Sequence, residues 1–128
     1  MPISMIDHYS IRTAKLGPTR DFYVEVMGLV DGDRPPFDFP GHWMYCGEKP
    51  IVHLIGKRKD SKGKTKLFAN GGGAVDHIAF QATDLKAVQK HLKKKKVKYD
   101  ERDVPGLNLH QIFLKDPNGV MIELTFRP

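Results

Sequence analysis

The stretch Asp76-His77-Ile78-Ala79-Phe80-Gln81 decides the fold, because it echoes Asp7-His8-Tyr9-Ser10-Ile11-Arg12 near the start of the chain. The two stretches lie 69 positions apart (76 − 7). A second pair, Ile51-Val52-His53-Leu54-Ile55 and Met121-Ile122-Glu123-Leu124-Thr125, lies 70 positions apart (121 − 51). Two landmarks that repeat at nearly one spacing indicate two copies of one supersecondary unit.

The segments between these landmarks follow the same order in both halves. Pro18-Thr19 predicts the start of a helix that Gly28 ends, and Asp84 predicts the N-cap of a second helix. Three strands are expected after each helix, near 29–33, 42–46 and 50–56, then near 97–102, 108–115 and 119–126. The predicted fold class is therefore α+β, built from two βαβββ modules. We expect a single domain over 1–128, with modules at about 1–69 and 74–128 and a Gly-rich joint at 70–73.

Composition and charge narrow the function classes. The chain has 128 residues, 40% of them apolar and 28% charged, as in a folded domain, and no apolar run approaches the ~20 residues of a membrane helix. With a single cysteine and no secretory signal, the sequence predicts a cytoplasmic protein. The net charge is 21 − 15 = +6. The lysine runs lack interleaved aromatic residues, so we expect solvated surfaces, not a nucleic-acid partner, and a small anionic substrate suits the charge.

Four polar side chains occupy matching places in the two halves. His8 and His77 take one position of the repeat, and His53 and Glu123 take the other, each among apolar neighbours that alternate faces along a strand. A carboxylate buried among apolar residues is costly without a cation or a partner. Pseudo-twofold packing of two equal units would bring the four together. Imidazole and carboxylate suit Fe, Mn, Ni, Co or Zn. The alternative is four unrelated structural or surface side chains.

These residues belong to a longer set of motifs that runs along essentially the whole chain. The set comprises Ile6-Asp7-His8, Arg20-Asp21-Phe22-Tyr23 with Met27-Gly28-Leu29, Val75-Asp76-His77-Ile78-Ala79-Phe80, and Lys115-Asp116-Pro117-Asn118-Gly119 followed by Ile122-Glu123-Leu124. In this set the sequence resembles the vicinal oxygen chelate superfamily, which includes glyoxalase I, extradiol dioxygenases, fosfomycin-resistance enzymes and methylmalonyl-CoA epimerase. The resemblance implies a curved mixed sheet around a divalent metal, and a homodimer. It also implies His8, His77 and Glu123 as metal ligands, with His53 as a fourth ligand or a catalytic acid/base.

The resemblance is less specific about the reaction. The two-histidine, one-carboxylate set favours an extradiol (catechol-type) dioxygenase, with Fe(II) or Mn(II) ahead of Ni, Co or Zn and His53 moving protons. Against this, Phe113 stands where such enzymes often carry Tyr. The first alternative is a glyoxalase- or epimerase-like lyase or isomerase that acts through a metal-stabilised enediolate. Such glyoxalases usually carry a carboxylate or Gln at the place of His53. The second alternative is a non-catalytic protein that binds a small molecule.

Hairpin register predicts which other residues line the pocket. A four-residue loop over Asp116–Gly119 would place Ile112 opposite Glu123 and His110 on the same face. A similar loop over Gly47–Pro50 would place Met44 opposite His53, with His42 nearby. Trp43, at the end of an aromatic segment that starts at residue 35, and Arg12, on the face of His8, complete the expected contacts with a small anionic or aromatic substrate. The predicted substrate-binding residues are thus Arg12, His42, Trp43, Met44 and His110.

Overall fold

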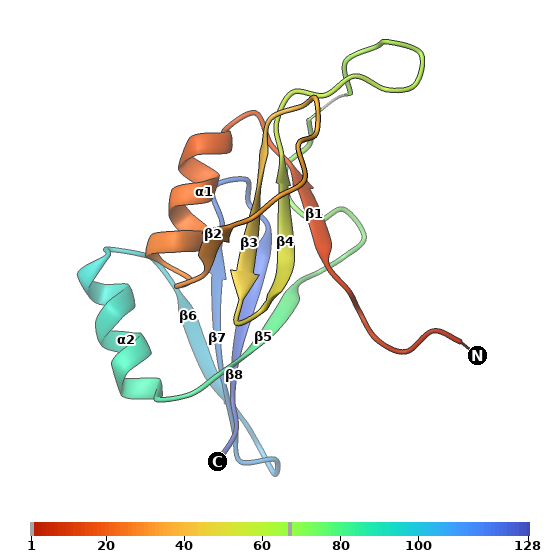
Figure 1. The fold of residues 1–128 in the computed structure, drawn as a ribbon. Coiled ribbons are helices and arrows are strands. Elements are labelled where there is room, and N and C mark those ends of the chain that lie inside the picture. The colour runs from red at the N-terminus through yellow and green to blue at the C-terminus, as the bar shows by residue number, and fades with distance from the viewer. Residues whose placement is uncertain (1, 67) are drawn as a thin grey trace. The chain divides into compact units, whose positions relative to one another are not determined.

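The order of strands and helices is the same in the two units of the chain (Figure 1). A computed structural model describes residues 2–66 and 68–128. The first unit, Met1–Ala69, contains β1 (Tyr9–Arg12), α1 (Leu16–Glu25), β2 (Val30–Gly32), β3 (Gly41–Cys46) and β4 (Lys49–Ile55). The second, Asn70–Pro128, contains β5 (Ile78–Ala82), α2 (Leu85–Lys94), β6 (Asp100–Val104), β7 (Leu109–Lys115) and β8 (Met121–Phe126). The predicted α+β class with two βαβββ modules is confirmed.

Each unit has its own four-stranded mixed sheet. The strand orders are β1-β4-β3-β2 and β5-β8-β7-β6, so the first and last strands of each unit pair in parallel and the others pair antiparallel. Ser10 lies opposite His53 in the first sheet, and Ala79 lies opposite Glu123 in the second. His8 and His77 each stand two residues before these partners. The repeat read from the sequence is thus reproduced at the level of strand register.

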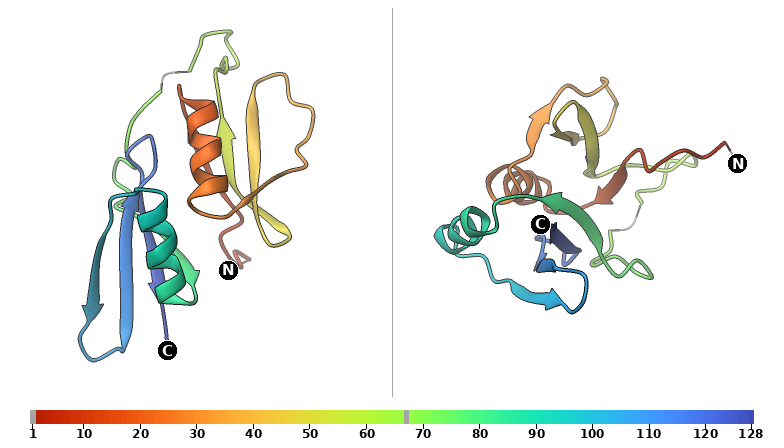
Figure 2. Two further views of the ribbon diagram at one scale, coloured as in Figure 1. Left: turned by 90° about the vertical axis from the view of Figure 1, so that its left-hand side faces the viewer. Right: turned by 90° about the horizontal axis from the view of Figure 1, so that it is seen from below.

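The core of the first unit lies between α1 and one face of its sheet (Figure 2). Val52, Leu54 and Met44 are fully buried on that face, and Tyr23 of α1 is fully buried against it. The helix begins at Leu16, two residues before the predicted Pro18, because the Thr19 amide already bonds the Lys15 carbonyl. It ends where Leu29 N bonds Tyr23 O and Gly28 adopts a φ of +72°, as expected for a glycine C-cap.

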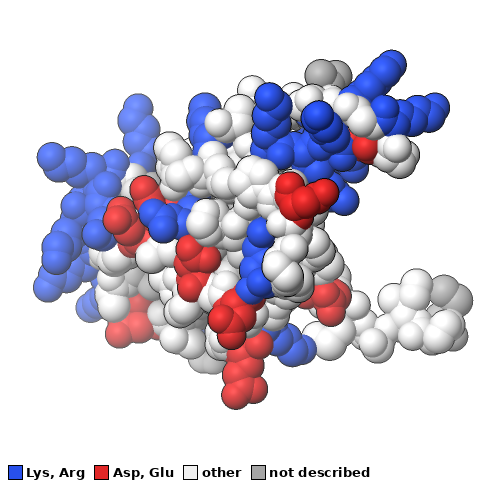
Figure 3. Space-filling view, turned by 45° about the horizontal axis from the view of Figure 1, so that its top comes forward, with Lys and Arg blue, Asp and Glu red and all other residues white. Residues whose placement is uncertain are grey.

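The second unit buries a matching apolar layer under α2. Leu92 of the helix is 1% exposed, and Ile112 and Ile122 of the sheet are fully buried. Asp84 caps the helix as predicted, since its side chain accepts a hydrogen bond from Ala87 N at 3.2 Å. The lysines of α2 face solvent and crowd together at the left of Figure 3. No helix in the described part of the chain has the length and apolarity to cross a membrane.

The hairpin loops differ from the predicted ones by one residue of register. In the second unit, Phe113 and not Ile112 lies opposite Glu123. The loop is longer than expected because the Asp116 carboxylate accepts hydrogen bonds from the amides of Asn118 and Val120, and Asp116 N bonds Val120 O. One extra loop residue moves every following side chain to the other face of the sheet.

In the first unit, the turn is shorter and a bulge offsets the register. Strand β4 already starts at Lys49, which pairs with Cys46 across Gly47, whose φ is +63°. A register shift between Met44 and Tyr45 follows, so that Trp43 lies opposite His53 and Met44 lies opposite Val52. Trp43 therefore shares the face of His53, and the placement predicted for Met44 is wrong.

Candidate metal and substrate site

The first unit holds its two histidines in a stack of three rings. The rings of His8 and His53 have centroids 3.7 Å apart and planes 13° apart, and Trp43 stacks on the other side of His53 at 4.2 Å. His8 Nδ1 lies 2.6 Å from the Asp7 carboxylate, which can only accept, so Nδ1 carries the proton and Nε2 keeps the lone pair. The hydrogen bond from His8 also lowers the pKa of Asp7.

His53 is held as a neutral base. Its Nε2 donates a hydrogen bond to the Pro50 carbonyl at 2.9 Å, which leaves Nδ1 with the lone pair. Burial under Trp43, followed by the neighbouring His8, lowers the pKa of His53 below that of a free imidazole. A neutral imidazole with a fixed tautomer can serve as a metal ligand or accept a proton.

A cavity of about 220 Å³ lies beside these rings within the first unit. Trp43, His53 and Pro50 line it together with the chain just before β1, including Asp7. Trp43 also contacts Phe37 of the preceding loop, with ring centroids 6.3 Å apart. The predicted pocket role of Trp43 is consistent with this position. Arg12 lies two residues along β1 from Ser10 and so shares the face of His53 by strand alternation.

The second unit holds a histidine against a carboxylate at the equivalent place. His77 Nε2 lies 3.1 Å from Glu123 Oε1, and His77 Nδ1 lies 2.8 Å from the Asp76 carboxylate. Glu123 is 5% exposed, and its other oxygen accepts a hydrogen bond from the buried hydroxyl of Thr125. Each unit thus carries an Asp–His pair and a second candidate metal ligand from its last strand, His53 or Glu123.

The donor chemistry fits a divalent metal. Asp76 fixes the proton of His77 on Nδ1, so a neutral His77 turns the lone pair of Nε2 toward an oxygen that is itself an acceptor. Two acceptors 3.1 Å apart need a proton or a cation between them. Carboxylates bonded to Nδ1 of ligand histidines are a usual outer shell of metal sites. Within residues 2–66 and 68–128, no group of three or more His, Cys, Asp or Glu side chains is placed to hold a metal ion.

The predicted substrate-binding residues did not include the neighbours of this pair on the same sheet face. Phe113 lies opposite Glu123, and its ring meets the edge of the His77 ring at 6.0 Å. Arg102 lies over Phe113 at 5.7 Å, and its Nε donates to Gln111 Oε1 at 2.7 Å. The signal that identifies them is the strand register: one residue of correction brings Gln111 and Phe113 onto the face of Glu123.

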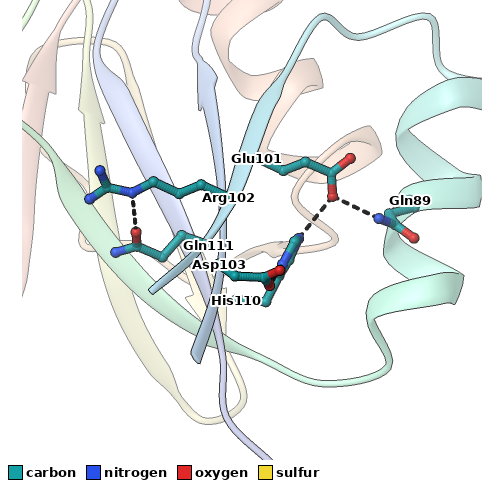
Figure 4. A network of polar contacts seen from close by, with 6 residues as sticks. All are labelled: Gln89, Glu101, Arg102, Asp103, His110 and Gln111. Carbon is teal, nitrogen blue, oxygen red and sulfur yellow. Dashed lines mark hydrogen bonds and ion pairs between the residues drawn. The ribbon is translucent and has the colours of Figure 1, made fainter. Parts of the chain in front are cut away.

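Two predicted pocket histidines lie on the opposite, helix-facing sides of their sheets. His42 pairs with Leu54 and bonds the Asp31 carboxylate at 3.0 Å. His110 pairs with Phe126, and its two ring nitrogens bond Asp103 at 2.7 Å and Glu101 at 2.8 Å (Figure 4). Because a residue cannot share a face with its strand neighbour in sequence, the placements predicted for His42 and His110 are wrong.

Comparison with known proteins places the chain among relatives with several functions. The sequence profile described as Glyoxalase/Bleomycin resistance protein/Dioxygenase superfamily matches residues 5–124. The protein named Glyoxylase I 4 from Arabidopsis thaliana is 28% identical over 125 residues, covering 95% of this chain and 70% of its own length.

Two solved structures illustrate the shared fold. Lactoylglutathione lyase from Agrobacterium tumefaciens has a TM-score of 0.72 at 18% identity, covering 98% of this chain and 96% of its own. An antibiotic-binding protein from a Streptomyces species has a TM-score of 0.70 at 18% identity, covering 100% and 99%. At these identities the likeness concerns the fold.

Proposed function

Because the chain belongs to the glyoxalase, bleomycin resistance protein and dioxygenase superfamily, we propose that it is a divalent-metal-dependent enzyme acting on a small substrate with two adjacent oxygens. The reaction we favour is a glyoxalase- or epimerase-like proton transfer. The observation that carries this proposal is the pairing of two fixed donors in each unit, His8 with His53 and His77 with Glu123.

We propose that His8, His77 and Glu123 hold the metal and that His53 is a fourth ligand or the catalytic acid/base. When bound, a divalent ion supplies Lewis-acid stabilisation of negative charge on the adjacent substrate oxygens. Asp7 and Asp76 orient the two imidazoles, and Thr125 orients the carboxylate of Glu123. Fe, Mn, Ni, Co and Zn all suit this donor set.

His53 has the properties of a proton acceptor. Burial and the neighbouring His8 lower its pKa, so the imidazole is neutral at pH 7. The Pro50 carbonyl fixes the proton on Nε2, and Nδ1 is therefore the atom that takes a proton from the substrate. Trp43 covers one face of the ring and holds its plane. General-base catalysis by a positioned side chain typically contributes about 10²- to 10⁴-fold in rate.

The glyoxalase-like reaction takes precedence over the dioxygenase-like one for two reasons. The relative from Arabidopsis thaliana, which matches 95% of this chain, carries the name Glyoxylase I 4. Phe113, directly opposite Glu123, has a bare phenyl ring next to His77 and no hydroxyl to share a proton. The dioxygenase-like reaction stays the second candidate, because His8, His77 and Glu123 supply two imidazoles and one carboxylate, a donor set that suits Fe(II).

The metal and the reaction are tested separately. Elemental analysis after reconstitution should find metal in the wild-type protein and far less in His8→Ala and Glu123→Ala, and equal content in all three would refute the site. Ni- or Zn-loaded protein should then turn over methylglyoxal in the presence of a thiol. Anaerobic Fe(II) loading followed by catechols and oxygen tests the second candidate, because oxygen uptake that depends on His53, without thiol-dependent turnover, would reverse the order. Binding without either turnover would leave a ligand-binding protein.

A homodimer is part of the same proposal. Each unit supplies two of the donors, so the active species needs one unit of each kind, from one chain or from two. Light scattering coupled to size-exclusion chromatography measures the mass in solution. A monomer that retains its metal would refute the dimer and leave the metal site standing.

A further inference from the structure

One row of polar side chains crosses the second sheet next to the proposed metal donors. Gln81, Thr125, Gln111 and Arg102 lie opposite one another on successive strands β5, β8, β7 and β6. The adjacent row on the same face contains Ala79, Glu123, Phe113 and Asp100. Two residues along a strand span about 7 Å, so the polar row runs within one substrate length of Glu123.

The polar row is not a requirement of the fold. The equivalent row in the first unit consists of Arg12, Ile55 and Gly41, so two of its strands carry an apolar side chain or none. The second unit instead buries the Gln111 side chain, at 9% exposed, and the hydroxyl of Thr125, at 6% exposed. Buried polar groups need partners, and here Thr125 bonds Glu123 while Gln111 bonds Arg102.

Arg102 is prepared to receive an anion. Its Nε donates to Gln111 Oε1 at 2.7 Å (Figure 4). The guanidinium lies over the Phe113 ring, 5.7 Å from the ring centroid. In the described part of the chain, neither terminal amino group of Arg102 has a hydrogen bond or ion pair, including with Asp100 two residues away on the same face. An arginine held at Nε keeps four N–H groups on its two terminal nitrogens, and two of these are parallel and match the oxygens of a carboxylate or a phosphate.

The acidic side chains of β6 next to Arg102 lie on the opposite face of the sheet, where they bond other residues. Glu101 and Asp103 point toward α2, where both bond His110, and Glu101 also accepts from Gln89 at 2.7 Å (Figure 4). These carboxylates therefore neutralise His110 and leave the charge of Arg102 unpaired. Phe113 fills the space between the guanidinium and His77, where it offers an apolar surface to the middle of a ligand.

We propose that Arg102, positioned by Gln111, binds a remote anionic group of the substrate and sets the substrate class. The class is an elongated molecule with two adjacent oxygens at one end, an apolar middle over Phe113, and a carboxylate or phosphate at the other end. This inference rests on the proposed function for the oxygen-chelating end. It adds the residue that distinguishes anionic from neutral substrates.

A matched pair of probes tests the anion site. The acid 3-(3,4-dihydroxyphenyl)propanoate and its methyl ester carry the same pair of oxygens and differ in one negative charge. Calorimetry on Zn-loaded protein avoids oxidation of the probes. Wild type should bind the acid about tenfold more tightly than the ester, because a charge-assisted pair contributes ~1.5 kcal/mol. Arg102→Gln should remove this preference and leave the affinity for the ester unchanged.

Three further variants separate the anion site from structural effects. Lys90→Gln on α2 removes the same charge elsewhere in the unit and should keep the preference. Arg102→Lys keeps the positive charge but loses the paired N–H groups of the guanidinium, and it should retain part of the preference for the acid over the ester. Gln111→Leu frees the guanidinium and should reduce the preference about threefold, because positioning is lost while the charge remains.

The outcomes distinguish this inference from the proposed function. An unchanged ratio of acid to ester affinity in Arg102→Gln, or an equal loss for both probes, overturns the anion site. Binding of neither probe to wild type also overturns it. Loss of thiol-dependent turnover with the ratio intact overturns the reaction alone. Elemental analysis of Arg102→Gln should find the same zinc content as wild type, so that the ratio reports on Arg102.

Discussion

The two units share the same strand register but carry different side chains at the equivalent place, His53 in the first and Glu123 in the second. In both, an Asp–His pair leads into the first strand, and the residue opposite the second position of that strand is the other proposed metal ligand. That donor is His53 in the first unit, stacked between His8 and Trp43, and Glu123 in the second, buried beside His77 and Thr125. The first pair consists of two stacked imidazoles, and the second pairs an imidazole with a buried carboxylate.

This difference divides the work within the proposed site. A buried carboxylate gains most from a cation, because the cation offsets the cost of keeping the charge away from water. A stacked neutral imidazole gains less from a cation, but it is a better proton acceptor near neutral pH. The second unit is therefore suited to retaining the metal, and the first to moving protons. A duplicated framework allows the two roles to diverge without altering the strand pairing.

The largest expected effect separates the two donors directly. Glu123→Gln keeps the shape of the side chain and removes its charge, so metal affinity should fall at least about 100-fold, beyond the 10- to 100-fold usual for outer-shell changes. His53→Gln, the matched change in the first unit, should reduce metal affinity about tenfold or less. Competition with a coloured chelator measures both. Equal losses of metal affinity would show that Glu123 and His53 contribute equally to metal binding, which would refute the proposed difference between the two units.

A second prediction compares the two aspartates that orient the histidines. Asp76→Asn and Asp7→Asn both weaken the hydrogen bond to Nδ1 of the following histidine. Loss of an outer-shell carboxylate costs about tenfold in metal affinity. We expect that cost for Asp76→Asn and a similar one for Asp7→Asn, since both are metal-orienting in the proposal. Unchanged affinity in both variants would make the aspartates surface residues only.

The sequence predicted the framework because its signals are local. The repeat of Asp-His before a strand, the cap at Asp84 and the glycine after α1 each act through neighbouring residues. The sites of failure were hairpins, where one residue decides the face. The Asp116 carboxylate holds two amides and lengthens one loop, and a bulge beside Met44 shifts the other. Neither carries a pattern that alternation alone detects.

These two shifts account for the wrong and the missed site residues. His42, Met44 and His110 were predicted on the site faces and lie on the helix-facing ones. Gln111 and Phe113 were left out of the predicted substrate-binding residues for the same reason, and they lie on the face of Glu123. The prediction for Trp43 rested on the aromatic segment and not on the register, and Trp43 lies opposite His53. His53 and Glu123 were placed by the repeat, and they occupy matching register positions opposite Ser10 and Ala79.

A third prediction tests the ring stack against its counterpart. Trp43→Ala exposes His53, so the pKa of His53 should rise toward that of a free imidazole, and half-burial of the indole predicts a loss of about 2 kcal/mol in unfolding free energy. Phe113→Ala is the matched change in the second unit. It should cost a similar amount and leave the pKa of His53 unaltered. NMR titration of the imidazole protons and chemical denaturation measure the two quantities. A His53 pKa that stays low in Trp43→Ala would refute the burial argument.

The smallest expected effect concerns two histidines whose pKa values shift in opposite directions. The hydrogen bond to Asp103, together with that to Glu101, raises the pKa of His110, while burial lowers that of His53. His110 therefore stabilises the fold below pH ~6.5, where the unfolded imidazole is also protonated, and this contribution is lost as the pH rises through the pKa of the folded state. The carboxylate partners are exposed to solvent, so the contribution is small. For His53, the unfolded state binds the proton more readily, and stability falls as the pH drops below ~6.5.

Denaturation of His110→Gln and His53→Gln from pH 5 to pH 9 should show the first variant approaching wild type at high pH. The second should lose less stability than wild type at low pH. Parallel pH profiles of unfolding free energy in the two variants would contradict the opposite pKa shifts of His110 and His53.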